Sequence, residues 1–582
     1  MTSPSQIPPA DHRDGAVPQT GSGPGAAPVA KPSPVEDLKR NSNHLRGAIA
    51  AELANENPAV SKPTSALLKF HGTYQQDDRD QRKQASGKSY SFMVRVSLPG
   101  GILASRQYLA LDALADSAGD GTLRITSRGG LQYHYVGKRT LRDCIRAIND
   151  SGLSTFAACG DVVRNVVAPA EPFETPQRRR LDEFARLLNR SLKPKTGAYA
   201  EIWLDGEPAV SFESEAEPLY GDAYLPRKFK FGFAVEGDNT TDIHIHDCGF
   251  VAHFEGGELL GFTALVGGGM GQSNGIKGTY PRLADPFCFL PPGDLLDVAQ
   301  AAVSIHRDFS DRCNRKRARL KYVIQDRGIE WFAGEMARRL GHPLAPPREL
   351  KWQRQADYFG WHEQSPGVWF FGLRIVSGRL GTAQRAAVRE VIETLTPEIR
   401  FTPQQNLLFC GLPAAARPVL EAILRRHRFA LPSQLPPVLL HSMACPALPT
   451  CGLALAESER VLPDLTARVQ SELDAAGAAG ETVFLRMTGC PNGCARPYTA
   501  EIGIVGQSPG LYSIYLGGSP VGTRLAQLYA HNIRFDDIGP ALAPLFRDWV
   551  ARRQPGESFG DYCHRVGLDE LRARHLEAPV EV

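Results

Sequence analysis

Stretches with apolar residues at strand-like spacing alternate with stretches at helical spacing from about residue 65 to the C-terminus. Residues 90–96 (YSFMVRV) are predicted to form a strand, and residues 107–116 (QYLALDALAD) a helix. Prolines cluster between 343 and 354 (PLAPPRELKWQR), where the pattern stops before it restarts. We therefore expect a mixed α/β chain with a boundary at this proline-rich stretch.

The restarted pattern repeats motifs of the first part. The motif Arg-x-Thr-x4-Leu begins at Arg124 and again at Arg400, 276 residues later, because 400 − 124 = 276. Likewise FMVR ends at Arg95 and FGLR ends at Arg374, and 374 − 95 = 279. Two matches at nearly one spacing favour an internal duplication. The repeat predicts a pseudo-twofold core with a central cofactor cleft.

The composition is that of a globular protein of several domains. The 582 residues leave room for about four domains, and 42% hydrophobic with 22% charged residues are ordinary values. No apolar run approaches the ~20 residues that cross a bilayer, so no membrane segment is expected. The net charge of +3 excludes a generic polyanion binder, and any electrostatic role depends on local clusters of basic residues.

Residues 1–40 are rich in Pro, Gly, Ala and Ser and are expected to be a disordered arm. The arm lacks the apolar core of a secretory signal, which makes the cytoplasm the default compartment. The eleven cysteines are an odd number in a large chain without such a signal, which argues against a disulfide framework.

Four of the cysteines form a constellation. Cys445 and Cys451 are spaced C-x5-C, and Cys490 and Cys494 are spaced C-x3-C around a Pro-Asn-Gly turn. Thiolates bind zinc, copper(I) or iron–sulfur clusters, and the apolar residues nearby favour a redox cluster in a dry pocket. From spacing alone, a structural zinc site and four unliganded buried thiols remain open alternatives.

The motifs around these cysteines are specific to a known family. ACPALPTCGLALAESER (444–460) and RMTGCPNGCARPYTAEIGIVG (486–506) resemble the paired cluster motifs of the sulfite and nitrite reductase hemoprotein family, especially its assimilatory sulfite reductases. The resemblance extends to SNHLRG (42–47), KFHGTYQQDDRD (69–80), RITSRGGLQYH (124–134), CGDVVRNV (159–166), LPRKFKF (225–231), PRLADP (281–286) and ESFGDY (557–562).

The resemblance implies a fold of duplicated ferredoxin-like half-domains combined with siroheme-binding and cluster-binding domains. The expected division is a disordered arm at 1–40, a first ferredoxin-like half-domain at 41–150, a first siroheme-binding domain at 151–345, a second ferredoxin-like half-domain at 346–430, and a 4Fe-4S and siroheme-binding domain at 431–582.

The resemblance also implies cofactors and a reaction. A 4Fe-4S cluster is expected on Cys445, Cys451, Cys490 and Cys494, with Cys494 linking it to the iron of a siroheme. The implied activity is the six-electron reduction of sulfite to sulfide in sulfur assimilation. Ordinary side chains cannot supply such electrons, so the protein contributes position and electrostatics.

Basic residues within the matching motifs are assigned by the same resemblance. Those expected to hold sulfite and help deliver protons are Arg95, Arg164, Lys228 and Lys230. Those expected around the siroheme edge are Arg124, Arg128, Gln132 and His134. A weaker set, in the basic run from 315 to 321, is Asn314, Arg315 and Lys316, and the rest of that run is expected to face solvent.

Two departures from the family pattern affect the siroheme contacts. Val163 stands where the family usually has Asn, and Gly130-Leu131 replaces a more restrictive pair. The loop from Gly267 to Gly271 lacks the spacing of a dinucleotide fingerprint. We therefore expect no flavin or nicotinamide on this chain, and electrons must come from a partner protein.

Three alternatives remain open at this point. Nitrite needs the same cofactors and electron count, although Lys228, Lys230 and the CPNGCARPY string favour sulfite. The donor is expected to be an NADPH-dependent flavoprotein subunit, with ferredoxin as the alternative. The remote alternative is a zinc-stabilised nucleic-acid-binding protein, which would be colourless; the enzyme interpretation includes neither nucleic acid nor membrane as a partner.

Overall fold

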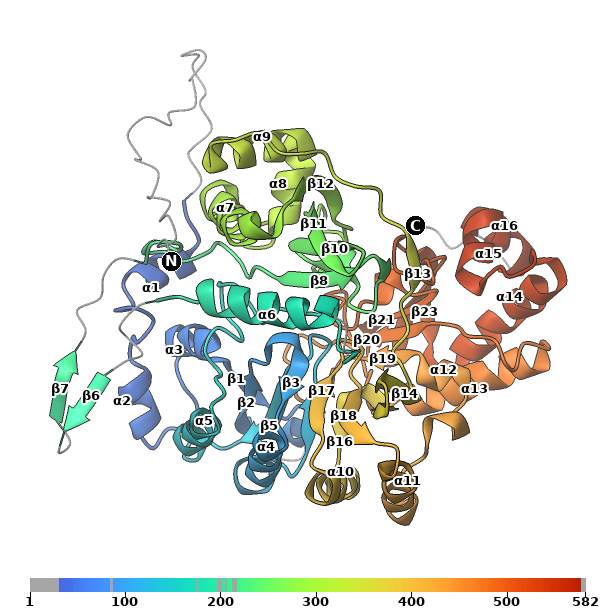
Figure 1. Ribbon diagram of the computed structural model, residues 1–582, viewed down its shortest axis with the longest axis horizontal. Coiled ribbons are helices and arrows are strands. Elements are labelled where there is room, and N and C mark those ends of the chain that lie inside the picture. Colours follow the sequence, from blue (N-terminus) through green and yellow to red (C-terminus); the bar gives the residue numbers. More distant parts are fainter. Residues whose placement is uncertain are drawn as a thin grey trace.

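Three lobes with separate hydrophobic cores make up the protein in the computed structural model, which describes residues 31–83, 87–173, 176–195, 201–204, 207–211 and 217–576. In Figure 1 the blue and yellow segments share the lower lobe, green forms the upper lobe, and orange and red form the lobe on the right. Within these ranges, no helix combines the length and apolarity needed to cross a bilayer.

The first half of the lower lobe is a five-stranded sheet covered by helices. Its strand order is β1 (Thr73–Asp77), β2 (Tyr90–Val96), β5 (Leu131–Val136), β4 (Leu123–Ile125) and β16 (Arg379–Leu380). Its helices are α4 (Ser105–Ala118) and α5 (Leu141–Asp150). The strand expected at 90–96 is β2, and the helix expected at 107–116 lies inside α4.

The second half repeats this arrangement with the same order of elements. Its strand order is β14 (Gly360–Ser365), β15 (Val368–Leu373), β18 (Leu407–Pro413), β17 (Glu398–Phe401) and β3 (Ile102–Leu103). Its helices are α10 (Thr382–Leu395) and α11 (Ala416–Arg426). The duplication expected from the repeated motifs is therefore present in the fold.

The two halves exchange their shortest strands. β3 of the first half pairs with β17 of the second, and β16 of the second pairs with β4 of the first. Gly101 and Gly378 stand at the two crossings with φ of 75° and 71°. A Cβ on Gly101 would lie 2.1 Å from the Phe401 carbonyl oxygen, and one on Gly378 would lie 2.2 Å from that of Ile125. Only glycine fits such an approach, and the exchange merges both halves into one core.

The upper lobe is built on a six-stranded sheet. Its order is β12 (Asp285–Leu290), β11 (Glu258–Val266), β10 (Cys248–Glu255), β8 (Phe231–Val235), β9 (Gly237–Asp238) and β13 (Trp352–Arg354). Helices α6 (Pro176–Ser191), α7 (Leu295–Phe309), α8 (Leu320–Arg327) and α9 (Ile329–Leu340) accompany it. Because β13 joins this sheet, the connection at the expected boundary near 345 remains part of the upper lobe.

The third lobe carries the four clustered cysteines. Its sheet has the order β19 (Ser442–Ala444), β20 (Leu485–Thr488), β21 (Ile502–Ser508), β22 (Leu511–Leu516) and β23 (Gln527–Arg534). Its helices are α12 (Pro437–Leu440), α13 (Leu462–Ala475), α14 (Ile538–Arg552), α15 (Phe559–Val566) and α16 (Leu568–His575). β19, β20 and β21 run parallel, so their carboxyl ends share one edge of the sheet.

The N-terminal segment is more ordered than its composition predicts. The expected disordered arm covers residues 1–40, of which 1–30 lie outside the described residues. Helix α1 (Pro34–Arg40) falls within the remainder and buries Glu36 and Lys39 against the upper lobe, where ion pairs hold it. Disorder therefore does not extend to residue 40. The remaining elements are α2 (Ile49–Ala54), α3 (Lys62–Leu68), β6 (Glu201–Leu204) and β7 (Glu207–Ser211).

Candidate active site

The four cysteines gather at the carboxyl edge of the third lobe's parallel strands. Cys445 directly follows β19, and Cys490 comes two residues after β20, its parallel neighbour. Cys451 and Cys494 follow in the two loops, and the Gly489 amide donates to the Cys445 Sγ at 3.3 Å. Segments far apart in sequence are brought together here by strand order alone.

The surroundings of the sulfurs differ. Cys445 is packed with Met443, Ala447, Ala454 and Ala495 in a small apolar cluster. Cys445 and Cys490 are buried, Cys451 is intermediate, and Cys494 is exposed although Ala495 beside it is buried. Two sulfurs are therefore buried and the Cys451 sulfur is partly buried, whereas Cys494 is exposed.

Burial and mutual repulsion shift the thiols' titration. Burial, followed by the charge of Cys494, raises the pKa of Cys445 and Cys451, and the same two causes raise the pKa of Cys490 to about 11. The four groups are thus close enough to interact. In the described part of the chain no three His, Cys, Asp or Glu side chains already stand in a metal-holding arrangement, so the ligand set stays a prediction.

A row of polar side chains crosses the first half-domain's sheet. In the strand register Arg95 of β2 lies opposite Gln132 of β5, which lies opposite Arg124 of β4. The Arg95 Nη1 donates to the Cys159 Sγ at 3.1 Å. With its amide oxygen turned toward Arg95, Gln132 accepts from Nη2 at 2.6 Å. The structure therefore groups three of the predicted residues on one face.

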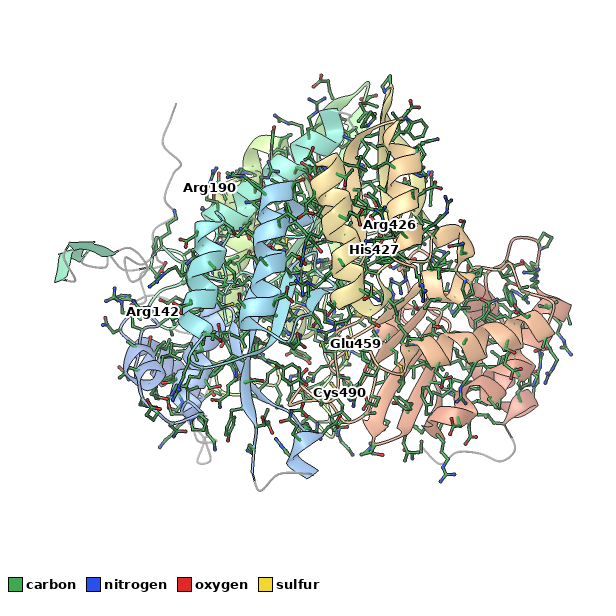
Figure 2. The ribbon with its side chains drawn as sticks, turned by 90° about the horizontal axis from the view of Figure 1, so that it is seen from below. Arg142, Arg190, Arg426, His427, Glu459 and Cys490 are labelled. Atoms are coloured by element: carbon green, nitrogen blue, oxygen red, sulfur yellow. The ribbon has the colours of Figure 1, made fainter. Side chains whose placement is uncertain are left out.

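Arg124 connects this row to the cysteine lobe. Its Nη2 donates to the carbonyl oxygen of Ala444 at 2.9 Å, one residue before Cys445, and its Nε pairs with Glu459 at 2.8 Å. Glu459 also accepts from Arg379 of the second half at 2.6 Å. In the view of Figure 2, Glu459 and Cys490 lie near the centre of the molecule, between the blue and orange segments. Glu459 was missed in the sequence analysis because no local pattern marks its two distant partners.

Two predicted residues carry buried polar atoms without partners. Arg128 donates through Nη2 to the Phe231 carbonyl at 3.0 Å, but its Nε and Nη1 have no hydrogen-bond partner among the described residues. Both ring nitrogens of His134 are likewise buried without a hydrogen-bond partner among the described residues. Burial first, and then Arg379, Arg124 and Arg95, hold the pKa of His134 well below its ordinary value. Such atoms cost free energy unless a ligand satisfies them.

Lys228 and Lys230 flank Phe229, which forms a bridge with Val163 in extended backbone. Burial, followed by Arg319, Arg227 and Arg164, lowers the pKa of Lys228 to about 7, and Cys494 opposes this shift. Lys228 is therefore within electrostatic reach of Cys494. For Lys230 the causes are burial and then the charge of Lys228, and its pKa is held well below the usual range.

Arg164 lies beside these lysines and is partly held by its own loop. Its Nε donates to the Gly160 carbonyl at 2.8 Å and its Nη1 to that of Ala158 at 3.1 Å. Against the effect of burial, Cys159, Tyr74 and then Cys494 raise the pKa of Arg95, and Arg164 is one of the cations that lower the pKa of Lys228. The four predicted sulfite residues and Cys494 therefore share one electrostatic neighbourhood.

Comparisons with known proteins agree with this geometry. The family model "Nitrite/Sulfite reductase ferredoxin-like half domain" matches residues 82–151 and again 362–427, and "Nitrite and sulphite reductase 4Fe-4S domain" matches 183–344. The sulfite reductase [NADPH] hemoprotein beta-component of Myxococcus xanthus is 45% identical over 92% of this chain and 96% of its own length. The sulfite reductase [ferredoxin] of Synechococcus elongatus is 44% identical over 94% of this chain and 92% of its own length.

The chain belongs to the nitrite and sulfite reductase family. The Mycobacterium tuberculosis NirA protein has the same fold, with a TM-score of 0.76 at 24% identity over 93% of this chain and 98% of that one. The two half-domain matches confirm the duplication in this family member. The matched 4Fe-4S domain contains Lys228 and Lys230, whereas all four clustered cysteines lie beyond it.

The weaker set of family-derived residues is dispersed. Asn314 and Lys316 are exposed, and their polar contacts are with their own turn, where the Asn314 Oδ1 accepts from the Lys316 amide at 3.1 Å. Arg315 is half-buried and pairs with Asp161 at 2.7 Å. The structure does not bring Asn314 or Lys316 to the other predicted residues, and their siroheme role stays a prediction.

Two other members of the same basic run face inward. Arg319 forms a two-pronged pair with Asp247, whose Oδ2 also accepts from the Lys230 amide at 2.9 Å. Lys321 donates to the carbonyls of Gly269 and Gly271 at 3.1 and 2.8 Å, and so holds the glycine-rich loop that was distinguished from a nucleotide site. Arg319 and Lys321 were expected to face solvent. Their spacing in the sequence could not show otherwise, because their carboxylate and carbonyl partners lie far away in the chain.

The Val163 departure has a structural consequence. Val163 is 3% exposed and packs in the apolar core of the upper lobe. Its backbone amide donates to the Tyr220 hydroxyl at 3.1 Å, so it is not available to the site. The neighbouring Asn165 instead donates to the carbonyls of Leu98 and Arg128. In this segment, the side-chain hydrogen bonds are therefore made by Asn165.

Proposed function

We propose that this protein reduces sulfite to sulfide, with a siroheme and a 4Fe-4S cluster as its cofactors. The reaction takes up six electrons and six protons per hydrogen sulfite and releases hydrogen sulfide ion and three waters. The observation that carries the proposal is an exposed Cys494 sulfur in the electrostatic neighbourhood of Lys228 and Arg95, beside the buried thiols of Cys445 and Cys490 and the partly buried thiol of Cys451.

The cysteine quartet fits an iron–sulfur cluster. Thiolates are the ligands such clusters take, and the alanine-lined pocket around Cys445 is apolar. The raised thiol pKa values describe the protein without metal, because bound iron deprotonates its thiol ligands. Cys494, as the exposed member, is the ligand we propose to lie next to the siroheme.

The unpaired buried donors fit a polycarboxylate macrocycle. Arg128 offers two unpartnered nitrogens, and Arg486 and Arg496 offer further ones among the described residues. Arg486 and Arg496 each pair with Asp242 at 2.9 Å, which leaves two cations for one carboxylate. An anionic ligand would satisfy these groups, and siroheme carries several carboxylates.

When bound, the siroheme and the cluster would pass on the donor's electrons and supply the iron that binds sulfur. This chain's residues bind and orient the anion: Arg95 and Arg164 stay charged and stabilise the oxyanion. Lys228, with its pKa near 7, is both charged and neutral around neutral pH and is suited to hand a proton to a departing oxygen. Burial and Lys228 hold the pKa of Lys230 well below its usual range, and an arriving anion would favour the charged form of this lysine.

We further propose an NADPH-dependent flavoprotein subunit as the electron donor, in the cytoplasm. Relatives named for NADPH and for ferredoxin are equally similar, at 45% and 44% identity, so identity does not separate the two donors. Mixing the protein with NADPH and a flavoprotein subunit, or with reduced ferredoxin, and measuring sulfide separates them. Sulfide with reduced ferredoxin alone would overturn the donor proposal and leave the reaction intact.

The reaction itself is tested by anaerobic turnover with a reduced viologen dye, which bypasses the natural donor. Sulfide formation with a kcat/KM for sulfite above that for nitrite is expected. A much larger kcat/KM for nitrite would contradict sulfite as the substrate and identify the protein as a nitrite reductase, since nitrite reduction uses the same number of electrons.

A further inference from the structure

The backbone that leads into Lys228 and Lys230 is held by side chains instead of by a sheet. Four consecutive carbonyl oxygens, those of residues 224–227, each accept a hydrogen bond from a different side chain, and we call this stretch the tethered segment. The pairs are Tyr224 O with Arg312 Nη2 at 2.8 Å, Leu225 O with Lys39 Nζ at 2.7 Å, Pro226 O with Arg315 Nη1 at 3.3 Å, and Arg227 O with His306 Nε2 at 2.9 Å.

Lys39 is the tether that comes from furthest away. It lies on α1, 186 residues before Leu225, and its side chain is only 1% exposed. Its ammonium group pairs with Glu36 at 2.7 Å and lies 3.8 Å from Asp161. Burying an ammonium group costs free energy unless the group is paired and fully hydrogen-bonded. The Leu225 carbonyl therefore accepts a hydrogen bond that the buried Lys39 needs.

Asp161 ties this contact to the rest of the network. Its carboxylate pairs with Arg315 at 2.7 Å and lies 3.8 Å from Arg227, and its backbone carbonyl accepts from the Leu225 amide at 3.1 Å. Lys39 and Arg315 therefore share one counter-charge while holding neighbouring carbonyls of the tethered segment.

The lysines beyond the tethered segment have little freedom of their own. The Phe229 amide donates to the Val162 carbonyl at 3.1 Å, and the Lys230 amide donates to Asp247 at 2.9 Å. A displaced tethered segment would shift the backbone of Lys228 directly. Displacement by about 1 Å is enough to weaken a site that depends on exact geometry.

We propose that Lys39 is a positioning residue for sulfite reduction. By holding the Leu225 carbonyl, with Glu36 and Asp161 as counter-charges, it fixes where Lys228 and Lys230 meet the anion. The proposal rests on the proposed function and gives α1 a role at the site without any contact to substrate.

The test compares Lys39→Met with Arg40→Met in the full-length holoprotein. Arg40 is the next residue of α1, is 43% exposed and, among the described residues, pairs with nearby Asp37, so its variant removes one charge without touching the tether. In Lys39→Met we expect hydrogen exchange of the amides of 224, 225 and 227–230 to quicken about tenfold. We expect its sulfite KM to rise about tenfold, its kcat to fall about tenfold because the proton-donating Lys228 is displaced as well, and its visible spectrum to stay normal.

Glu36→Gln keeps the size of the side chain and provides the measurement if Lys39→Met does not fold. It should shift exchange and KM in the same direction by about threefold, because a counter-charge is lost while the tether remains. If Lys39→Met folds and keeps the wild-type hydrogen exchange and sulfite KM, the proposal is overturned. If Lys39→Met does not fold, wild-type hydrogen exchange and KM in Glu36→Gln would overturn it. A wild-type protein that makes no sulfide would instead overturn the proposed function, while the exchange data would still report on the tether.

Discussion

The two half-domains share one fold, but the arginine that ends the repeated motif in each half is used differently. Arg95 at the end of β2 is partly exposed and contacts Cys159 and Gln132. In the second half Gly372 pairs with Leu408 as Arg95 pairs with Gln132, so the motif's Arg374 stands two residues beyond the position of Arg95. Arg374 is 1% exposed and donates to the carbonyls of Leu439 and Ser442 and to the Asn406 side chain. One arginine remains available to an anion, and the other binds the second half to the cysteine lobe.

The neighbouring positions show the same contrast. Gln132 and His134 of β5 correspond, at the 276-residue spacing, to Leu408 and Cys410 of β18. Leu408 and Cys410 pack in an apolar cluster with Phe370, whereas the His134 nitrogens lack partners among the described residues. The duplication therefore preserved the backbone while one half acquired the site and the other became its support, as expected when function lies in residues placed on a fold.

The largest effect is expected from Arg374→Met. It leaves several buried carbonyl oxygens without a donor, so the free energy of unfolding should fall by about 3–5 kcal/mol. Denaturant titration measures this, with Arg425→Met, exposed on α11 of the same half, as a control that should change it by less than about 0.5 kcal/mol. Equal stability of the two variants would contradict a structural role for Arg374.

Arg95→Met should show the opposite behaviour. Loss of a cation aimed at the anion should reduce kcat/KM for sulfite by about 10²-fold, while stability changes little. Steady-state turnover with a reduced viologen dye measures this, and Arg106→Met, exposed on α4 of the same half, is the matched control. If Arg95→Met lost stability as Arg374→Met does, the proposed contrast between the halves would be wrong.

Gly101 and Gly378, at the two strand crossings, test whether both halves depend on the strand exchange to the same extent. Gly101→Ala and Gly378→Ala should each lower the free energy of unfolding by about 2 kcal/mol, because both combine a positive φ with a clash against a carbonyl oxygen. Gly367→Ala is the control, since its φ is 79° but open space surrounds it. A large difference between Gly101→Ala and Gly378→Ala would show that the two crossings are not equivalent.

The smallest effect concerns pH. Lys228 has its pKa lowered to about 7, so it is charged below neutral pH and loses its proton as pH rises. Sulfite turnover should therefore fall about tenfold per unit once pH exceeds about 7. Sulfite itself titrates near neutrality, so the comparison is with Lys228→Arg, which stays charged and should retain only the substrate's own dependence. Identical profiles would remove Lys228 from proton delivery.

Regular elements and the duplication were predictable from local pattern. β2 has the predicted bounds, and the repeated motifs anticipate the paired halves. The exchanged strands β3 and β16 were not predicted, because two residues carry no periodicity. Helix α1 was assigned to a disordered arm, since its stability comes from ion pairs of Lys39 with Asp161 and of Glu36 with Arg312 in the upper lobe.

The site was predictable where motifs carry it and not where distant partners decide it. The cysteine quartet and the row from Arg95 to Arg124 lie together as the family motifs imply. In the basic run from 315 to 321, the buried residues are Arg319 and Lys321, each fixed by a partner at least 41 residues away. Helical or loop spacing cannot identify such partners.

The central claim is that the quartet binds an iron–sulfur cluster beside a siroheme, and it is tested by the metal content and visible spectrum of purified protein. We expect iron, porphyrinoid absorption bands and no zinc, with the bands or their coupling to the cluster lost in Cys494→Ser and kept in Cys313→Ser, which changes an exposed cysteine outside the quartet. A colourless wild-type protein that contains zinc without iron would contradict the account.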